Sequence, residues 1–241
     1  MQTIRISLLG HGLFMDTVRS VLEKHFTIVA NDPDLFLVAN FGRKVSLSEL
    51  DMGKYINIHA SLLPKLKGAS PIQTAILFNE NITGYTLIKM DDQIDHGPII
   101  ASGKVKILPD DDYDSLANKI ALASARKLIH IIPDFLNNKI KLRSQDESKT
   151  TWTKKITDQD RIISQDEIKN HPQKADARVR ALFPKPKAYI ILNGKRLIIH
   201  RAKIENTRFI PLLVQLEGKK VIFWQDFLRG WRGKNIFPLA N

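Results

Sequence analysis

The chain has 241 residues, of which 43% are hydrophobic and 26% are charged, so it can bury the core of one large or two small domains. It has no cysteine, which excludes disulfides, thiol catalysis and cysteine-ligated zinc and is typical of cytoplasmic proteins. No apolar run approaches about 18 residues, and the N-terminal residues do not follow the signal-peptide pattern. We therefore expect a cytoplasmic protein with no membrane partner.

The net charge of +12 is unevenly distributed. Residues 1–150 contain 18 Lys/Arg and 17 Asp/Glu, a balance of +1, whereas residues 151–241 contain 19 and 8, a balance of +11. A nearly neutral half joined to a strongly basic half indicates a catalytic domain followed by a module that binds a polyanion such as nucleic acid. The alternative is that the charge only favours solubility.

The first 137 residues alternate predicted strands and helices. The expected strands are 3–9, 26–30, 35–39, 55–59, 83–90 and 98–108. The expected helices are 14–25, 46–51, 71–78 and 113–137, the last with a buried stripe of Leu116, Ile120, Ala123, Leu128 and Ile132. This alternation is typical of an α/β fold with a doubly wound, mainly parallel sheet.

Two short patterns that could indicate a cofactor have simpler explanations. The turn Gly10-His11-Gly12 follows the first strand, but Met15 stands where the dinucleotide-binding fingerprint needs a glycine, so we expect no nicotinamide cofactor. The cluster Asp110-Asp111-Asp112 precedes the long helix, where the helix dipole favours negative charge. We interpret this cluster as a helix cap in preference to a metal site, and we expect no metal.

The predicted strand 55–59 carries two polar side chains on one face. Because side chains two apart on a strand point the same way, Asn57 and His59 should lie side by side, with Ile56 and Ile58 facing the opposite layer. Pro64 prevents the strand from continuing. Ligands of open α/β sheets bind where such strands give way to loops.

Two loops complete this region. Residues 61–68 are apolar and cationic at once, which suits a flat, anionic organic molecule. The strand 83–90 ends in the acidic loop 91–98, which places carboxylates at a strand end.

These residues carry a family resemblance. The blocks read N-I-H-x-S-L-L-P-x-x-x-G from Asn57, T-G from Thr83 and I-D-x-G-x-I-I from Ile94. In this order they resemble the formyltransferases that use 10-formyltetrahydrofolate. G-A-S-P-I-Q from Gly68 is more similar to methionyl-tRNA formyltransferases than to glycinamide-ribonucleotide formyltransferases. The resemblance implies a formyltransferase-like Rossmann fold with a smaller C-terminal β-rich, OB-like domain.

The resemblance extends through the second half. Residues 150–156 and 160–162 resemble the segment that joins the two domains in this family, and residues 177–184 end a helix in the family's manner. Asn193-Gly194 between the predicted strands 187–192 and 196–202 is a strong hairpin signal. We therefore predict a catalytic domain over 1–137, a linker over 138–156 and a basic OB-like domain over 157–241.

The chain also departs from the family. It is several dozen residues shorter, and the family's basic insertion before the third strand, which touches the tRNA, has no counterpart. The first turn lacks the family's Gly-Thr-Pro, so we assign no residues to the methionine pocket.

Formyl transfer requires a neutral amine to attack the formyl carbon, an oxyanion to be stabilised and a proton to leave. On the resemblance, Asn57 donates to the oxyanion. His59 donates to the oxyanion or moves the proton. Asp95 orients His59 or a water, and accepts the proton if burial raises its pKa. No metal or nucleophilic serine is needed.

The remaining folate contacts follow from the same resemblance, and the nucleic-acid contacts follow from the distribution of positive charge. The folate donor is expected to contact Asn40, Phe41, Gly42, Ser61, Leu62, Leu63, Pro64, Asp91, Asp92, Gln93 and Ile94. The nucleic acid is expected to contact Arg43, Lys65, Lys67, Arg178, Arg180, Lys185, Lys187, Arg201, Lys203, Lys219, Lys220, Arg229 and Arg232. No chemical role is predicted for His11, His25, His96, His130, His171 and His200.

We predict a monomeric enzyme that formylates initiator methionyl-tRNA. The alternatives are an amino-sugar-nucleotide N-formyltransferase, which fits the missing insertion, and a non-catalytic RNA-binding relative. The basic C-terminal half favours tRNA, because a sugar nucleotide offers only two phosphates.

Overall fold

The computed structural model describes residues 3–231, which divide into two compact units. Among these residues, the first unit takes in 3–72, Asn81–Ile107 and Ser115–Lys154. The second takes in Gln73–Glu80, Leu108–Asp114 and 155–231. The domain limits given above from the sequence stay a prediction.

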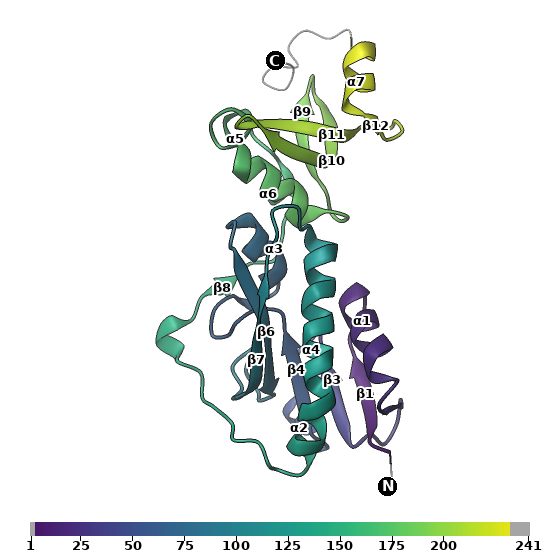
Figure 1. Ribbon diagram of the computed structural model, residues 1–241, viewed down its shortest axis with the longest axis vertical. Helices are drawn as coiled ribbons and strands as arrows, with labels where there is room; N and C mark the ends of the chain where they lie inside the picture. Colours follow the sequence, from purple (N-terminus) through teal and green to yellow (C-terminus); the bar gives the residue numbers. More distant parts are fainter. Residues whose placement is uncertain (1–2, 232–241) are drawn as a thin grey trace. The chain divides into compact units, whose positions relative to one another are not determined.

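A six-stranded sheet forms the centre of the first unit, in the order β2-β1-β3-β4-β6-β7 (Figure 1). Its strands are β1 (Arg5–Leu9), β2 (Thr27–Ile28), β3 (Leu35–Val38), β4 (Tyr55–His59), β6 (Ile82–Lys89) and β7 (Ile99–Lys106). The pairings among β1, β2, β3 and β4 are parallel, whereas β4 with β6 and β6 with β7 are antiparallel. The predicted, mainly parallel α/β sheet is confirmed, with an antiparallel pair at one edge.

Three helices lie wholly or largely in this unit: α1 (Leu13–Leu22), α2 (Leu47–Asp51) and α4 (Tyr113–Leu136). The helix α3 (Pro71–Leu77) begins in this unit, but its residues from Gln73 onward belong to the second unit. The helices α1 and α4 lie side by side (Figure 1), and Thr17 Oγ1 donates to Asn118 Oδ1 at 3.0 Å. Ser46 caps α2 through a full capping box with Glu49, as its position before the helix predicted.

The apolar side of helix α4 is buried, and so are apolar residues of the central strands. Four of the five predicted stripe residues, Leu116, Ile120, Leu128 and Ile132, have no exposed surface, but Ala123 is half-buried and its neighbour Ser124 takes the buried place. In the sheet, Ile6, Leu35, Leu37, Ile56 and Leu87 are equally inaccessible. Removal of this apolar surface from water is the main contribution to folding.

The second unit is built on a four-stranded antiparallel sheet in the order β12-β11-β10-β9. Its strands are β9 (Ala188–Leu192), β10 (Lys195–Glu205), β11 (Arg208–Leu216) and β12 (Ile222–Phe223). Asn193 and Gly194, with φ of 49° and 73°, form the predicted hairpin turn. The sheet is open among the described residues, so the β-rich, OB-like domain has two sheet edges there.

One face of this sheet packs on helices through a separate apolar core that includes Val179, Leu197, Ile199, Phe209 and Trp224. Besides most of α3, this unit contains the helices α5 (Gln165–Asn170), α6 (Pro172–Leu182) and α7 (Trp224–Gly230) and the 3₁₀ turn η2 (Gln159–Arg161).

A third, two-stranded sheet belongs to the first unit. It pairs β5 (Lys67–Gly68) in parallel with β8 (Trp152–Thr153), which follows the 3₁₀ turn η1 (Glu147–Lys149). Residues 138–156 appear as a linker in the sequence because they offer few large apolar side chains. Many of their contacts in the structure are made by backbone and polar groups, which leave no periodic hydrophobic pattern, although Ile156 packs against an apolar core.

Within residues 3–231, no helix has the length and apolar character needed to span a membrane.

Candidate active site

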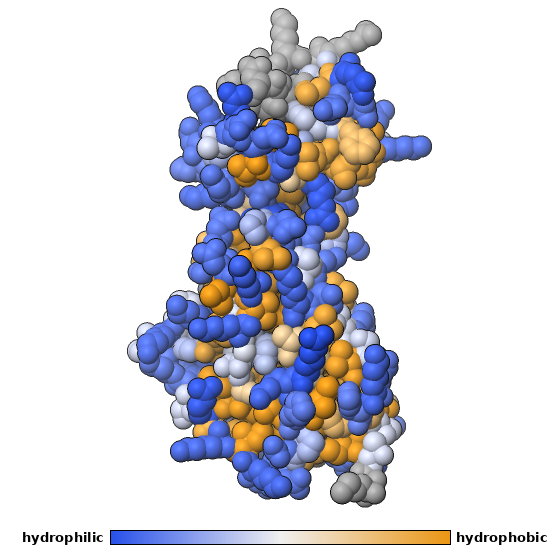
Figure 2. All heavy atoms as spheres, in the orientation of Figure 1, coloured by the Kyte–Doolittle hydropathy of each residue, from blue (hydrophilic) through white to orange (hydrophobic). Residues whose placement is uncertain are grey.

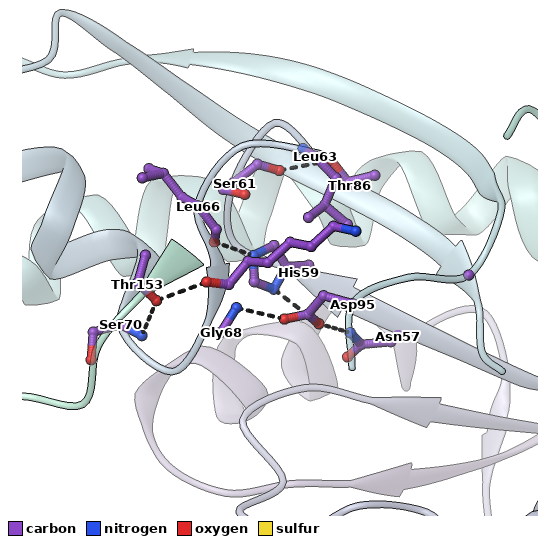
Figure 3. Close-up of polar contacts among 12 residues, drawn as sticks. Asn57, His59, Ser61, Leu63, Leu66, Gly68, Ser70, Thr86, Asp95 and Thr153 are labelled. Carbon is purple, nitrogen blue, oxygen red and sulfur yellow. Dashed lines mark hydrogen bonds and ion pairs between the residues drawn. The ribbon is translucent and has the colours of Figure 1, made fainter. Parts of the chain in front are cut away.

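The strand β4 presents Asn57 and His59 on the same face, as predicted (Figure 3). Ile56 and Ile58 are buried on the opposite face. His59 is 6% exposed and Asn57 is half-buried, so the amide is the more accessible of the two polar groups.

Asp95 joins these two residues. Asn57 Nδ2 donates to Asp95 Oδ1 at 3.2 Å, and His59 Nδ1 lies 3.3 Å from the same oxygen. The backbone N–H of Gly68 donates to Asp95 Oδ2 at 2.8 Å (Figure 3). The structure therefore brings together the three residues that the sequence predicted to be catalytic.

Asp95 reaches this position by a path that the strand-end argument did not foresee. Because β6 is antiparallel to β4, it ends at Lys89 beside Ile56, away from the His59 end of β4. The loop then turns back, with Asp95 in the left-handed region at φ 50°. Gly97 permits this return, because a Cβ there would lie 1.9 Å from the carbonyl oxygen of Lys89.

The electrostatics of Asp95 correct one expectation. Burial by itself raises the pKa of Asp95, but the hydrogen bond and charge of His59, the Gly68 N–H and the Lys67 ammonium outweigh it and hold the pKa below its ordinary value. Asp95 is therefore an anion at neutral pH. It is a poor proton acceptor and a good partner for a cationic or donating imidazole.

The second nitrogen of His59 also has a partner. Nε2 lies 2.8 Å from the carbonyl oxygen of Leu66 (Figure 3), and since a carbonyl only accepts, this nitrogen carries the hydrogen. The ring is thus held between Leu66 and Asp95. A reacting group that meets His59 in the ring plane has to take the place of one of these two partners.

Hydrogen bonds and apolar contacts of its buried residues hold the conformation of the loop 61–68. Ser61 is fully buried and its Oγ donates to the carbonyl of Lys65 at 2.6 Å. Thr86 Oγ1 donates to the Ser61 carbonyl at 2.7 Å and accepts from the Leu63 N–H at 3.0 Å. Leu63 packs in an apolar cluster with Ile88 and Ile99. Of the four loop residues predicted to contact folate, only Leu62 and Pro64 keep a partly exposed side chain.

Most of the other residues predicted to contact folate are exposed to solvent. Asn40 is exposed and donates from Nδ2 to the His11 carbonyl at 3.0 Å, and Gly42 is exposed. Phe41 is half-buried and packs in a cluster with Tyr55 and Met90. Asp92, Gln93 and Ile94 are exposed as well.

His96, for which no chemical role was predicted, belongs to the same acidic loop. Its Nδ1 lies 2.7 Å from Asp91 Oδ2, and Asp91 Oδ1 accepts from the Gln93 N–H at 3.0 Å. Asp91, predicted to contact folate, therefore has two partners within its own loop.

Several cationic side chains predicted to bind nucleic acid form ion pairs with carboxylates. Lys67, with a side chain 2% exposed, pairs with Glu147. Arg178 pairs with Glu167 and Arg180 with Asp176, at 20% and 14% exposure. A buried cation needs such a partner because desolvation of a lone charge is costly. The predicted contact of these three with nucleic acid stays a prediction, and each would have to exchange its carboxylate partner for a phosphate.

The remaining predicted cations are more accessible. Arg43, Arg201, Lys203 and Arg229 pair with Glu49, Asp112, Glu205 and Asp226 at or near the surface. Among residues 3–231, no ion pair engages Lys65, Lys185, Lys187, Lys219 or Lys220, of which all but the half-buried Lys187 are exposed. Arg232 lies outside the described residues.

No group of three or more His, Asp or Glu side chains that could hold a metal ion occurs in the described part of the chain.

Comparison with known proteins agrees with this geometry. Residues 21–132 match the family model described as Formyl transferase. Over 229 residues the chain is 32% identical to the methionyl-tRNA formyltransferase of Dictyoglomus thermophilum, covering 83% of this chain and 72% of the relative. The chain belongs to the methionyl-tRNA formyltransferase family. The resemblance noted from the sequence is confirmed, and with it the assignment as an enzyme.

Solved structures show the same fold. The methionyl-tRNA formyltransferase from Clostridium thermocellum superposes with a TM-score of 0.69 at 18% identity, covering 89% of this chain and 99% of that protein. HypX from Aquifex aeolicus, solved in complex with tetrahydrofolic acid, gives a TM-score of 0.72 at 17% identity, covering 85% of this chain and 38% of that protein.

Proposed function

We propose that this protein transfers the formyl group of 10-formyltetrahydrofolate to the amino group of methionyl-tRNA, the formylation of initiator tRNA in translation initiation. The observation that carries the proposal is the convergence of Asn57, His59 and Asp95 in a member of this family. The folate supplies the formyl group when bound. The chain supplies a hydrogen-bond donor in Asn57, a proton carrier in His59 and a fixed negative charge in Asp95.

Each of the three residues has a role that its contacts support. Asn57 is partly exposed and holds an uncharged amide donor toward an oxyanion, a contribution of about 3–4 kcal/mol. His59 takes the proton that leaves the amine at Nδ1, because Nε2 already carries the hydrogen that it donates to the Leu66 carbonyl. Asp95 stays ionised because its pKa is lowered, and it orients His59 and stabilises the imidazolium.

We place the donor beside this group, against Asn40–Gly42, Leu62, Pro64 and the loop 91–94. Val38 of β3 pairs with Asn57, which supports the nearness of the segment that follows β3. The partly exposed apolar side chains Phe41, Leu62 and Pro64 suit a flat ring system, and the exposed backbone of the loop 91–94 suits its polar edge.

For the acceptor we propose a tRNA backbone tracked by exposed cations. Lys185, Lys219 and Lys220 of the second unit and Lys65 of the first are exposed. Figure 2 shows hydrophilic side chains over much of the surface on one face of the molecule. The paired but accessible Arg43, Arg201, Lys203 and Arg229 can exchange a carboxylate for a phosphate. Arg178 and Arg180 cannot do so without leaving a mostly buried carboxylate unpaired, and the Lys67 side chain is only 2% exposed.

The rival acceptor is an amino-sugar nucleotide, for which the missing basic insertion is the supporting observation. The family of the D. thermophilum relative and the +11 balance of residues 151–241 favour tRNA. A non-catalytic RNA-binding role is disfavoured because the Asn57, His59 and Asp95 contacts are intact.

The test is to offer a radiolabelled formyl donor to charged initiator tRNA and, in parallel, to amino-sugar nucleotides, with His59→Ala as the inactive control. Label on methionyl-tRNA supports the proposal. Label on the sugar alone would overturn it, and label on neither would favour the binding-protein alternative.

We also propose that the protein acts as a monomer in the cytoplasm. The lack of cysteine is typical of that compartment, and a net charge of +12 opposes self-association. Light scattering with size exclusion tests the monomer; a dimer mass would contradict it.

A further inference from the structure

The segment 145–153 contacts the active-site loop from about 80 residues away along the chain. Its strand β8 pairs in parallel with β5, so that Trp152 lies opposite Lys67 and Thr153 opposite Gly68. A segment that only connects two domains does not require such pairing, so the pairing indicates that β8 supports β5.

The strand β5 is the backbone support of two predicted catalytic side chains. Immediately before it, the Leu66 carbonyl accepts from His59 Nε2 at 2.8 Å, and within it the Gly68 N–H donates to Asp95 Oδ2 at 2.8 Å (Figure 3). A displacement of β5 therefore moves the partners of both the imidazole and the carboxylate.

Two threonine hydroxyls in the 145–153 segment hold this backbone. Thr151 Oγ1 accepts from the Leu66 N–H at 2.9 Å. Thr153 Oγ1 donates to the Lys67 carbonyl at 3.0 Å and accepts from the Ser70 N–H at 3.0 Å (Figure 3). The Thr151 carbonyl also accepts from the Lys67 N–H at 2.9 Å. The peptide groups around Lys67 are thus held from the side opposite to His59 and Asp95.

An ion pair between a buried lysine and a half-exposed glutamate adds a third anchor. Lys67 Nζ lies 2.9 Å from both carboxylate oxygens of Glu147, with its side chain 2% exposed. Thr150 Oγ1 donates to Glu147 Oε2 at 2.9 Å. Removal of the carboxylate would leave a buried ammonium without a partner, which is strongly unfavourable.

The same segment holds the acidic loop as well. Gln145 Nε2 donates to the carbonyl oxygens of Asp95 and Gly97, each at 2.9 Å. The segment therefore fixes Asp95 from two directions, through its own backbone and through Gly68.

We propose that residues 145–153 form a positioning element of the active site, in which Gln145, Glu147, Thr151 and Thr153 set the geometry of His59 and Asp95 through β5 and the acidic loop. The inference rests on the proposed function, because it takes His59 and Asp95 as the groups that act on the substrates. None of the four is a catalytic residue in this scheme; each acts through another group.

Steady-state kinetics with methionyl-tRNA and the folate donor test the inference. Thr153→Val keeps the shape and removes the hydroxyl, and Thr153→Ser restores the hydroxyl. We expect kcat to fall by about 10- to 100-fold in Thr153→Val, because a misplacement near 1 Å has effects of this order, with KM for both substrates changed by less than about 3-fold. Thr153→Ser should recover kcat to within about 3-fold of wild type.

A second variant and a matched control guard against a simple loss of folding. Glu147→Gln keeps the shape of the side chain and leaves Lys67 uncompensated, so it should lower kcat in the same way. Thr17→Val removes a hydroxyl that bonds Asn118 on α4, away from β5, and should leave kcat unchanged. Wild-type kcat in both Thr153→Val and Glu147→Gln would overturn the inference.

Imidazole NMR separates this inference from the proposed function. His59 is assigned by comparison with His59→Gln, and its ring ¹⁵N shifts should change in Thr153→Val and return in Thr153→Ser. If the wild-type protein formylates no tRNA, the proposed function fails, while the His59 shifts still report on positioning. Unchanged shifts in Thr153→Val would refute the positioning role even in an active enzyme.

Discussion

The carboxylate of Asp95 lies 3.3 Å from Nδ1 of His59, although the strand that leads to Asp95 runs away from the His59 end of β4. The same carboxylate accepts from Asn57 at 3.2 Å, so one anion connects an amide donor with an imidazole.

The first prediction follows from this shared carboxylate. Asn57→Ala, His59→Ala and Asp95→Ala should each lower kcat by roughly 10²–10⁴-fold without unfolding the protein. Because the three side chains contact one another, the losses should be non-additive, and the double variant His59→Ala/Asp95→Ala should be little worse than the poorer single variant. Additive losses in single-turnover kinetics would contradict a joint role.

The second prediction concerns pH and stability. The pKa of Asp95 in the folded protein lies below its ordinary value of 3.8. A lowered carboxyl pKa contributes stability that is present above the unfolded pKa and is lost as pH falls below it through the folded pKa. Wild type should therefore exceed Asp95→Ala in unfolding free energy at neutral pH, and the difference should shrink below about pH 4. Urea unfolding of both proteins between pH 3 and 7 measures it; a difference that grows with acidity would contradict the lowered pKa.

The third prediction separates exposed cations from buried ones. Lys219→Ala/Lys220→Ala should weaken tRNA binding and reduce the slope of log affinity against log salt by up to about 2, since each lysine that neutralises a phosphate contributes about 0.9 for a duplex. Arg180→Ala should leave the slope unchanged and instead lower the thermal stability, because it leaves the mostly buried Asp176 without its partner. Filter binding between about 50 and 200 mM salt tests both. A slope reduced by Arg180→Ala would show that this arginine reaches the RNA.

The fourth prediction tests the return of the acidic loop. Gly97→Ala places a methyl group 1.9 Å from the Lys89 carbonyl oxygen, so the loop must shift and carry Asp95 with it. We expect a loss of roughly 1–3 kcal/mol in unfolding free energy, together with a fall in kcat. Gly230→Ala, where a new Cβ meets no atom of residues 3–231 within 4 Å, is the control and should change neither. Full activity in Gly97→Ala would mean that Asp95 does not depend on this close approach.

Local patterns in the sequence were enough for much of the fold. The alternation of residues 55–59 predicted β4 and the shared face of Asn57 and His59, Ser46 predicted the cap of α2, and Asn193-Gly194 predicted the hairpin. Each of these depends on sterics and hydrogen bonds between residues a few positions apart, so the information lies within a short stretch of chain.

Only the tertiary structure decided which distant groups meet. The antiparallel direction of β6, the contacts of Thr151 and Thr153 with β5, and the pairing of Lys67 with Glu147 join residues from 27 to 86 positions apart. The sequence does not distinguish a cation that faces solvent from one that pairs with a carboxylate, which is why the ion pairs of Lys67, Arg178 and Arg180 could not be predicted. Their environment is set by the packing of the whole unit, because the desolvation that forces the pairing arises only when the chain has folded around them.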